Sequence, residues 1–269
     1  MKTPITYYGG KQQLAPVILN MIPAHKIYCE PFFGGGAVFF AKAPSFLEAI
    51  NDKNDLLVTF YQQCRENFEQ LNAKIQNTLL SESLYRKAKH IWKNPCHRSR
   101  LDIAWAVWTI TNMSVMATPA GGWKRDNGTG GSHIGIGRAN YRAQFTEKVK
   151  ERLERVQIYC RDAIDVILEK DSEESFFYLD PPYIGCEQKH YKGYGKKDFQ
   201  QLLEVLKDIK GKFILSHFNN KMLANYIESN GWNVKTVSRM SCLPNLTNKT
   251  RQKTEVLVYN YVRYPQLFD

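Results

Sequence analysis

The sequence lacks any cluster of side chains that could bind a metal ion or form disulfides. Its six cysteines are widely separated and show no paired spacing: Cys29, Cys64, Cys96, Cys160, Cys186 and Cys242. This scatter indicates reduced thiols, as is usual in a cytoplasmic protein. The six histidines are equally dispersed and the carboxylates do not cluster. We therefore expect no metal ion and disfavour a two-metal nuclease.

Long apolar segments are also missing. No run approaches the length needed to span a membrane, and no N-terminal apolar stretch resembles a signal peptide. Hydrophobic residues still make up 43% of the 269 residues, enough for a sizeable core. The length suits one large α/β domain, or one domain that carries an insertion. We expect a cytoplasmic protein with no membrane partner.

Acidic residues are in the minority, and the imbalance is local. The formal net charge is +11, and residues 85–155 hold 14 Lys/Arg against 5 Asp/Glu, which accounts for +9 of it. A concentration of positive charge is typical of proteins that bind a polyanion. A solvated helix face is the ordinary alternative, but the localisation of the charge favours nucleic acid.

The dinucleotide pattern G-x-G-x-x-G is absent, although a related unit is present. Residues 26–30 are predicted to form a strand, Gly34-Gly35-Gly36 a turn, and the residues from 37 onward a helix. Asp52 ends a second predicted strand about twenty residues later, where an acid commonly binds ribose hydroxyls. A cofactor with a ribose but no pyrophosphate fits this pattern. Capping of a helix that begins near Asn54 is the alternative role for Asp52.

An aromatic and glycine-containing loop precedes this unit. In Tyr7-Tyr8-Gly9-Gly10-Lys11 the glycines allow the backbone to approach a ligand closely. Tyr7 could cover an apolar or aromatic group, and Lys11 could pair with a carboxylate. An ordinary N-terminal turn explains the pattern equally well.

The most informative stretch is Asp180-Pro181-Pro182-Tyr183, which follows an apolar run at 176–179. Proline fixes φ and lacks an N–H, so the predicted strand ends at Asp180, at the edge where open α/β sheets bind ligands. There a carboxylate and a stiff backbone carbonyl can accept the two N–H hydrogens of an adenine amine, and Tyr183 can stack on the base. A strand-ending turn with an exposed acid is the alternative.

The middle of the chain is predicted to be helical, with helices at 56–80, 82–93 and 99–113. A loop is predicted to follow the third helix. Residues 117–141 contain seven glycines, and so long a glycine-rich loop is usually functional or disordered. It carries side chains of the kinds that contact base edges and phosphates: Trp123, Lys124, Arg125, Arg138 and Asn140. We predict a DNA-reading loop, with a flexible surface excursion as the alternative.

Strands return after residue 156. We predict strands at 156–160 and 212–216, and an antiparallel pair at 232–238 and 255–262. Asp162 lies at the end of the first of these strands, where it could reach a cofactor's base. The basic and aromatic loop 185–197 could close over a flipped base, although plain disorder is an equal alternative.

Together these motifs resemble the DNA adenine methyltransferases of the Dam type. The matching segments occur in that family's order: Tyr7-Tyr8-Gly9-Gly10-Lys11, Glu30-Pro31-Phe32-Phe33-Gly34-Gly35-Gly36-Ala37-Val38-Phe39, Ile50-Asn51-Asp52-Lys53-Asn54, Asp180-Pro181-Pro182-Tyr183-Ile184-Gly185 and Phe213-Ile214-Leu215-Ser216. Each segment is moderately specific alone, and five in order are very specific. They cover the first sixty residues and everything after about residue 156.

The resemblance implies a Rossmann-like α/β sheet that binds S-adenosylmethionine, with residues 1–60 and 151–269 as the catalytic domain. Residues 61–150, which include the glycine-rich loop 117–141, would be an inserted helical target-recognition domain. By position, the implied cofactor contacts are Tyr7, Lys11, Glu30, Phe33, Gly34, Asp52, Asp162 and Asp180. Asp180, Pro181 and Tyr183 would bind the target adenine after it is rotated out of double-stranded DNA.

The target-recognition segment departs from the family pattern. Members that read GATC usually carry an Asn-Arg-x-Cys-(Phe/Tyr)-Asn-Gly-type segment, whereas this chain has Thr111-Asn112-Met113-Ser114-Val115. Asn112 is therefore a candidate DNA contact, but the recognition sequence is not predicted. A cognate restriction enzyme is a possible partner, and the oligomeric state is not indicated.

Two other functions stay open at this point. One is methylation of adenine in RNA or of cytosine, and aminocytosine enzymes more often show Ser-Pro-Pro-Tyr and another motif order. The second is a catalytically silent DNA-binding regulator on the same fold, against which the intact acid and aromatic positions argue.

Overall fold

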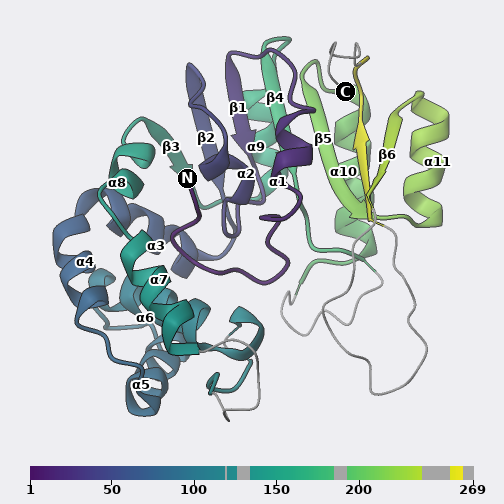
Figure 1. Cartoon of the computed structure of the whole chain (residues 1–269). Coiled ribbons are helices and arrows are strands. Elements are labelled where there is room, and N and C mark those ends of the chain that lie inside the picture. Colours follow the sequence, from purple (N-terminus) through teal and green to yellow (C-terminus); the bar gives the residue numbers. More distant parts are fainter. Residues whose placement is uncertain (119, 126–133, 185–192, 238–254, 263–269) are drawn as a thin grey trace. The chain divides into compact units, whose positions relative to one another are not determined.

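The computed structural model describes residues 1–118, 120–125, 134–184, 193–237 and 255–262. Within them the strands are β1 (Ile27–Glu30), β2 (Leu47–Asn51), β3 (Val156–Tyr159), β4 (Ser175–Leu179), β5 (Lys212–Phe218), β6 (Asn233–Val237) and β7 (Glu255–Tyr259). These strands form one sheet in the order β3-β2-β1-β4-β5-β7-β6 (Figure 1).

The strand pairing is mixed. β2 pairs with β3, β1 with β4 and β4 with β5 in parallel, whereas β7 is antiparallel to both β5 and β6. A parallel strand covered on both faces needs a continuous apolar sequence, and β4 is buried at all five of its residues. The predicted Rossmann-like α/β class and the predicted antiparallel pair near the C-terminus are confirmed.

The chain divides into two compact units. Unit 1 comprises residues 1–20 and 33–162, and unit 2 comprises residues 21–32 and 163–269. The helices of unit 1 are α1 (Ala15–Leu19), α2 (Ala37–Ala41), α3 (Asp55–Glu66), α4 (Phe68–Gln76), α5 (Glu82–Lys93), α6 (Arg100–Met113), the 3-10 turn η1 (Val115–Ala117), α7 (Ile134–Gln144) and α8 (Lys148–Leu153). The bounds of these two units differ from the bounds of the predicted domains. The inserted target-recognition domain at 61–150 therefore stays a prediction.

Helix α6 forms the centre of the helical part of unit 1. It is apolar on all sides and buries most of its length, which is typical of a helix surrounded by others. Helices α3, α4 and α5 pack against it. The sequence correctly predicts α5, and the Ser81 side chain caps this helix by accepting a hydrogen bond from the Leu84 N–H.

Two sequence predictions in this region are wrong. The single helix predicted over 56–80 is two helices, since Asn67 leaves the helical conformation with φ −135° and ψ 40°. Residues 134–141, predicted as glycine-rich loop, belong to α7. The glycines lower the helix propensity of that segment, and the tertiary structure overrides this weak preference.

A buried ion cluster fixes α8 to the start of β2. Glu48 accepts hydrogen bonds from Nη1 and Nη2 of Arg152 and from Lys42 Nζ. The side chains of all three residues are at most 8% exposed. The Arg152 guanidinium also lies over the Phe39 ring, with 3.5 Å between the guanidinium carbon and the ring centroid, and donates to the Phe39 carbonyl. Charge pairing therefore holds segments that are more than a hundred residues apart.

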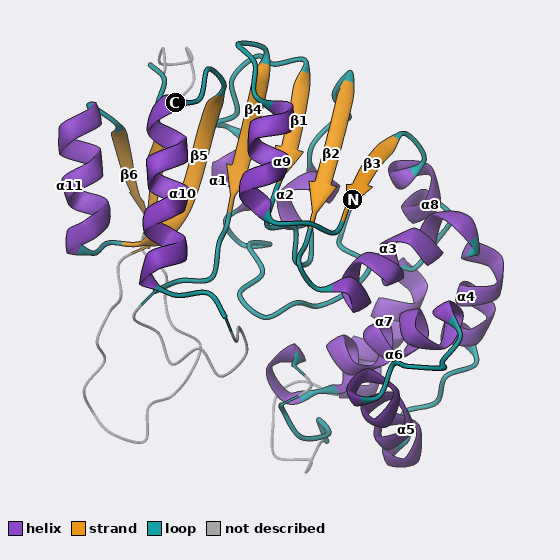
Figure 2. Cartoon of the chain, turned by 180° about the vertical axis from the view of Figure 1, so that it is seen from behind, coloured by secondary structure: helices purple, strands orange, loops and turns teal. Residues whose placement is uncertain are grey.

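Unit 2 contains β1, β4, β5, β6 and β7 together with α9 (Ala163–Lys170), α10 (Lys196–Asp208) and α11 (Lys221–Asn230). Figure 2 shows α9 and α10 over the same face of its strands. Helix α11 ends at Asn230, and the next residue, Gly231, caps it with a φ of 63° that suits glycine. β5 is longer than predicted, because the strand continues through His217 and Phe218.

Candidate active site

In unit 1 the glycine turn supports the ring of Tyr7. Gly34 has φ +50°, and a Cβ there would lie 3.0 Å from Tyr7 Cδ1. A Cβ on Gly35 would lie 2.8 Å from Tyr7 Cβ. Only residues without a side chain allow this approach of ring and backbone. The structure thus brings together Tyr7 and Gly34, two predicted cofactor contacts that are far apart in sequence.

Asp52 joins the same site at the end of β2. Its Oδ2 accepts a hydrogen bond of 2.8 Å from the Gly34 N–H, and its Oδ1 accepts one of 2.9 Å from the Asn54 N–H. Burial raises the pKa of Asp52, although both hydrogen bonds act in the opposite direction. The helix-capping alternative is wrong, since Asn54 is the N-cap of α3. Each Asp52 oxygen keeps a further lone pair for a ligand hydroxyl.

Lys11 closes the N-terminal loop onto itself. The side chain is buried, at 4% exposure, and its Nζ donates a 3.0 Å hydrogen bond to the Gly9 carbonyl. Gly9 has φ +74°, and the Gly10 N–H donates to the Tyr7 carbonyl. The segment is therefore a tight turn that presents Tyr7 on one side and ends in a buried cation.

The other predicted cofactor contacts have different surroundings. The Phe33 ring is buried against Tyr61 and Phe39, with ring centroids 4.8 and 5.4 Å away. Asp162 is exposed and forms a 3.2 Å ion pair with Lys53. Glu30, in unit 2, is 1% exposed and accepts a hydrogen bond from the Tyr28 hydroxyl. Their roles as cofactor contacts stay predictions.

Sequence reasoning missed Tyr61 as part of this site. Its hydroxyl donates a 2.8 Å hydrogen bond to the Gly34 carbonyl, which helps to hold the turn in its left-handed conformation. In the sequence Tyr61 is one of several apolar residues at helical spacing, so no local signal distinguishes it from a core residue.

In unit 2 the Asp-Pro-Pro-Tyr segment follows β4 directly. β4 ends at Leu179, Asp180 is half-buried, and Pro181 is buried. The Tyr183 hydroxyl donates a 2.6 Å hydrogen bond to Glu255 Oε1 on β7 and lies 2.7 Å from the Ser216 hydroxyl on β5. Burial, and then the nearby carboxylates of Asp180 and Glu255, raise the pKa of Tyr183 well above its ordinary value. The phenol therefore keeps its proton.

Two more residues of β5 contact this segment. His217 Nε2 accepts a 3.1 Å hydrogen bond from the Ile184 N–H. The Tyr183 ring lies 4.8 Å from the His217 ring and 4.7 Å from the Phe218 ring, in the second case edge to face. Ser216 belongs to a motif that the sequence singles out, but nothing in the sequence links Glu255 to Tyr183, 72 residues away.

The predicted DNA contacts lie in unit 1. Residues 113–115 run against residues 122–124, with hydrogen bonds from the Lys124 N–H to the Met113 carbonyl and from the Val115 N–H to the Gly122 carbonyl. Lys124 and Arg125 follow with exposed side chains, and Trp123 is half-buried. The Tyr85 hydroxyl of α5 fixes the turn through the Gly121 carbonyl, at 2.7 Å.

The remaining predicted DNA contacts lie on α6 and α7. Asn140 is exposed on α7, and Arg138 belongs to the same helix. Asn112 is engaged within the protein, because its Oδ1 accepts from the N–H and the hydroxyl of Thr6 and its Nδ2 donates to the Trp108 carbonyl. The loop at 185–192, predicted to close over a base, lies outside the described residues.

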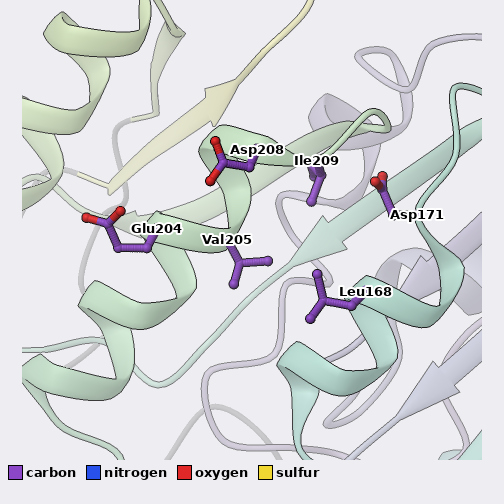
Figure 3. A pocket seen from close by; sticks show the side chains of 6 residues that line it. All are labelled: Leu168, Asp171, Glu204, Val205, Asp208 and Ile209. Atoms are coloured by element: carbon purple, nitrogen blue, oxygen red, sulfur yellow. The ribbon is translucent and has the colours of Figure 1, made fainter.

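A hollow in unit 2 is a poor candidate for the same chemistry. It is lined by Leu168, Asp171, Glu204, Val205, Asp208 and Ile209 (Figure 3). Asp171 already accepts hydrogen bonds from the backbone N–H groups of Lys210 and Gly211, just before β5 begins. The hollow therefore lies at the amino-terminal end of β5, whereas Asp180 follows the carboxyl end of β4, parallel to it.

In the part of the chain that the structure describes, no three His, Cys, Asp or Glu side chains gather as metal ligands. Among the described helices, none combines the length and apolar character of a membrane span.

A mixed seven-stranded sheet, a glycine turn beside an acid at the end of β2, and Asp-Pro-Pro-Tyr after β4 together define a class of protein. This class is the methyltransferases that use S-adenosylmethionine and act on an exocyclic amine. Comparison with known proteins agrees, because the model of the D12 class N6 adenine-specific DNA methyltransferases matches residues 7–241. The chain belongs to this family.

Curated relatives support the same assignment. The type II methyltransferase M1.LlaDCHI of Lactococcus lactis subsp. cremoris is 27% identical over 94% of this chain and 93% of its own length. The type II methyltransferase M.MjaIII of Methanocaldococcus jannaschii is 26% identical over 74% of this chain and 75% of its own length. The protein is thus a site-specific adenine DNA methyltransferase, and the RNA, cytosine and silent-regulator alternatives are not favoured.

Proposed function

We propose that Asp180, Pro181 and Tyr183 carry out methyl transfer to the N6 amine of an adenine that has been rotated out of double-stranded DNA. The observation that carries this proposal is the position of Asp180, directly after a strand that is buried at all five residues. The strand fixes the backbone of the acid, and the two prolines that follow restrict it further. A preorganised acceptor pair of this kind needs little rearrangement during the reaction.

The chemistry follows from the nature of the target. The exocyclic amine is a weak nucleophile because its lone pair is conjugated with the purine ring. The Asp180 carboxylate and the Pro181 carbonyl each accept one N–H of the amine, which turns the lone pair toward the methyl donor. Rotation of the base out of the duplex costs a few kcal/mol. Stacking on Tyr183, worth roughly 1–3 kcal/mol, offsets part of this.

S-adenosylmethionine is the methyl donor implied by the family, and it supplies a methyl group activated by its sulfonium centre. The residues of unit 1 fit such a ligand. Tyr7 presents a ring beside the glycine turn at Gly34, and Asp52 offers lone pairs for ribose hydroxyls. We propose these residues, with Lys11 and Asp180, as the principal cofactor contacts, and Glu30, Phe33 and Asp162 as further ones.

For DNA binding we propose the exposed residues of unit 1. Lys124 and Arg125 extend from a turn held by α5, and Asn140 is exposed on α7. Basic side chains at these positions suit phosphates, and the neighbouring Trp123 and the amide side chains suit base edges. Arg138 and Asn112 remain candidates for the same surface. The family and the basic charge of residues 85–155 support this assignment.

The substitution Asp180→Ala tests the catalytic assignment. We expect methyl transfer to fall by about 100-fold or more, as for the loss of other preorganised groups in active sites. The assay is transfer of a tritiated methyl group from S-adenosylmethionine to long unmodified duplex DNA, with nucleoside analysis to identify N6-methyladenine. Asp208→Ala, at an exposed position of α10, is the matched control. Transfer by Asp180→Ala at the wild-type rate would refute the assignment.

A cognate restriction endonuclease is a further proposed partner, on the ground that the relatives are named type II methyltransferases. Expression of the chain in a host that lacks adenine methylation, followed by sequencing with modified-base detection, will give the recognition sequence. DNA from that host should resist an endonuclease of the same specificity. Modification without a fixed sequence would argue against a restriction partner.

A further inference from the structure

Glu255 is a buried carboxylate that the proposed reaction does not use. It begins β7, is 0% exposed, and faces β5, where its register partner is Phe218. Its Oε1 accepts hydrogen bonds from two hydroxyls, those of Tyr183 at 2.6 Å and Ser216 at 3.0 Å. A buried polar group is costly unless it is hydrogen-bonded. Its presence at the start of β7, between β5 and β6, therefore requires an explanation.

The arrangement assigns a direction to the hydrogen bonds. Tyr183 keeps its proton, because burial and neighbouring carboxylates raise its pKa, so the phenol is a donor to Glu255. Ser216 is also fully buried and directs its hydroxyl to the same oxygen. The phenol oxygen is thus held at a fixed point between β5 and β7.

The residue after Tyr183 is held independently. The Ile184 N–H donates to His217 Nε2, so Nδ1 carries the ring proton, and it lies 2.8 Å from the Phe218 carbonyl that accepts it. His217 is 0% exposed, and its ring stacks on Phe199 with 4.2 Å between centroids. The Tyr183 side chain is therefore hydrogen-bonded to Glu255 on β7, and the Ile184 backbone is hydrogen-bonded to His217 on β5.

We infer that Glu255 is a positioning residue for the methyltransferase reaction, which acts through the Tyr183 hydroxyl to fix the ring that contacts the target adenine. Ser216 supports it by donating to the same carboxylate oxygen. The inference rests on the proposed role of Tyr183 and extends it, since nothing here requires Glu255 to touch DNA or cofactor. A ring displaced by about 1 Å can cost 100-fold in rate.

The test compares Glu255→Ala, Glu255→Gln, Ser216→Ala and Tyr183→Phe. Single-turnover methyl transfer to long unmodified duplex DNA gives the rate constant, and calorimetry gives the S-adenosylmethionine affinity. We expect Glu255→Ala and Tyr183→Phe each to slow transfer about 10- to 100-fold. Glu255→Gln, whose amide oxygen can still accept, should restore the rate to within a few-fold. Cofactor affinity should change less than about twofold in all four.

The double variant separates positioning from a general loss of stability. If Glu255 acts through the hydroxyl, Tyr183→Phe with Glu255→Ala should be no slower than the slower single variant. Additive rate losses would overturn the inference. Glu228→Gln, on an exposed position of α11, is the matched control and should retain the wild-type rate.

Other outcomes are equally decisive. If Glu255→Ala fails to fold, the variants Ser216→Ala and Glu255→Gln provide the test. A wild-type rate for Ser216→Ala together with a large loss of rate for Glu255→Gln would contradict positioning through the hydroxyls. Wild-type rates in folded Glu255→Ala would overturn the inference while leaving the proposed function intact. Absence of N6-methyladenine with the wild-type chain would instead refute the proposed function.

Discussion

Gly34 illustrates how a single residue without a side chain creates part of the site. Its φ of +50° lies in the left-handed region. Its N–H donates a hydrogen bond to Asp52, and its carbonyl accepts one from the Tyr61 hydroxyl. The ring of Tyr7 occupies the space that a Cβ would need. One residue thus connects the aromatic loop, the end of β2 and α3, all within unit 1.

The substitution Gly34→Ala is expected to weaken S-adenosylmethionine binding about tenfold or more. The left-handed conformation costs a residue with a Cβ roughly 1–2 kcal/mol, and the methyl group would also push against Tyr7, 3.0 Å away. Calorimetric titration with S-adenosylmethionine measures the loss.

Gly137→Ala is the control for Gly34→Ala. It lies in α7 with no atom near enough to contact an added Cβ, and alanine suits a helix better than glycine. Equal cofactor affinities for both variants would show that the turn does not form part of the cofactor site.

At the scale of elements, the Glu48 cluster ties α8 to β2 and α2. Burial alone would raise the pKa of Glu48, but hydrogen bonds from Arg152 and Lys42 outweigh this and lower it. A carboxyl whose pKa falls on folding stabilises the protein above its ordinary pKa, near 4.5. That contribution disappears as the pH drops through the lower pKa of the folded state.

Glu48→Gln should therefore destabilise unit 1 at neutral pH, by about 3 kcal/mol if it behaves as other broken buried pairs do. The difference from wild type should shrink as the pH falls below 4.5. Urea unfolding at several pH values measures it.

Glu69→Gln is the control for the ion cluster. Glu69 pairs with Lys150, but its side chain is 70% exposed, so solvent screens the pair and little change is expected. A Glu48→Gln difference that stays constant from neutral to acid pH would contradict the assigned role of the carboxylate.

On the scale of the whole molecule, the excess positive charge and the Asp-Pro-Pro-Tyr segment belong to different units. Residues 85–155 hold most of the excess positive charge, and all of them belong to unit 1. The Asp-Pro-Pro-Tyr segment belongs to unit 2, where aromatic rings and buried hydrogen bonds surround Tyr183. The proposed electrostatic binding of DNA and the proposed positioning of the target base would thus rest on different physical interactions.

Replacing Lys124 and Arg125 together by alanine should weaken DNA binding while leaving S-adenosylmethionine affinity unchanged. Two lost phosphate contacts should reduce the slope of log K against log salt by about 1.8. Fluorescence anisotropy of a labelled duplex at about 50 to 200 mM salt gives this slope.

The matched control removes the same charge from exposed positions of unit 2, by Lys221→Ala with Lys235→Ala. An equal slope change in both double variants would mean that net charge, rather than the turn at 121–125, determines affinity.

Local chemistry made several features predictable. Proline cannot continue a strand, so the end of β4 at Leu179 follows from Pro181 and Pro182, and the end of α11 follows from Gly231. The order of the motifs predicted the family. The helix break at Asn67 and the helix over 134–144 were missed, because propensity at those segments is weak and packing decides.

The sequence by itself determined the family of this protein, because its motifs, such as an acid followed by two prolines and an aromatic ring, need only adjacency along the chain. Only the tertiary structure decided what holds them. Glu255 reaches Tyr183 through the antiparallel pairing of β7 with β5, and Tyr7 reaches Gly34 through the folding of the N-terminal loop. The residues around Glu255 in the sequence do not single it out, and the motifs that contain Tyr7 and Gly34 do not reveal that the two residues meet. Strand pairing and loop closure bring together residues whose separation along the chain carries no signal.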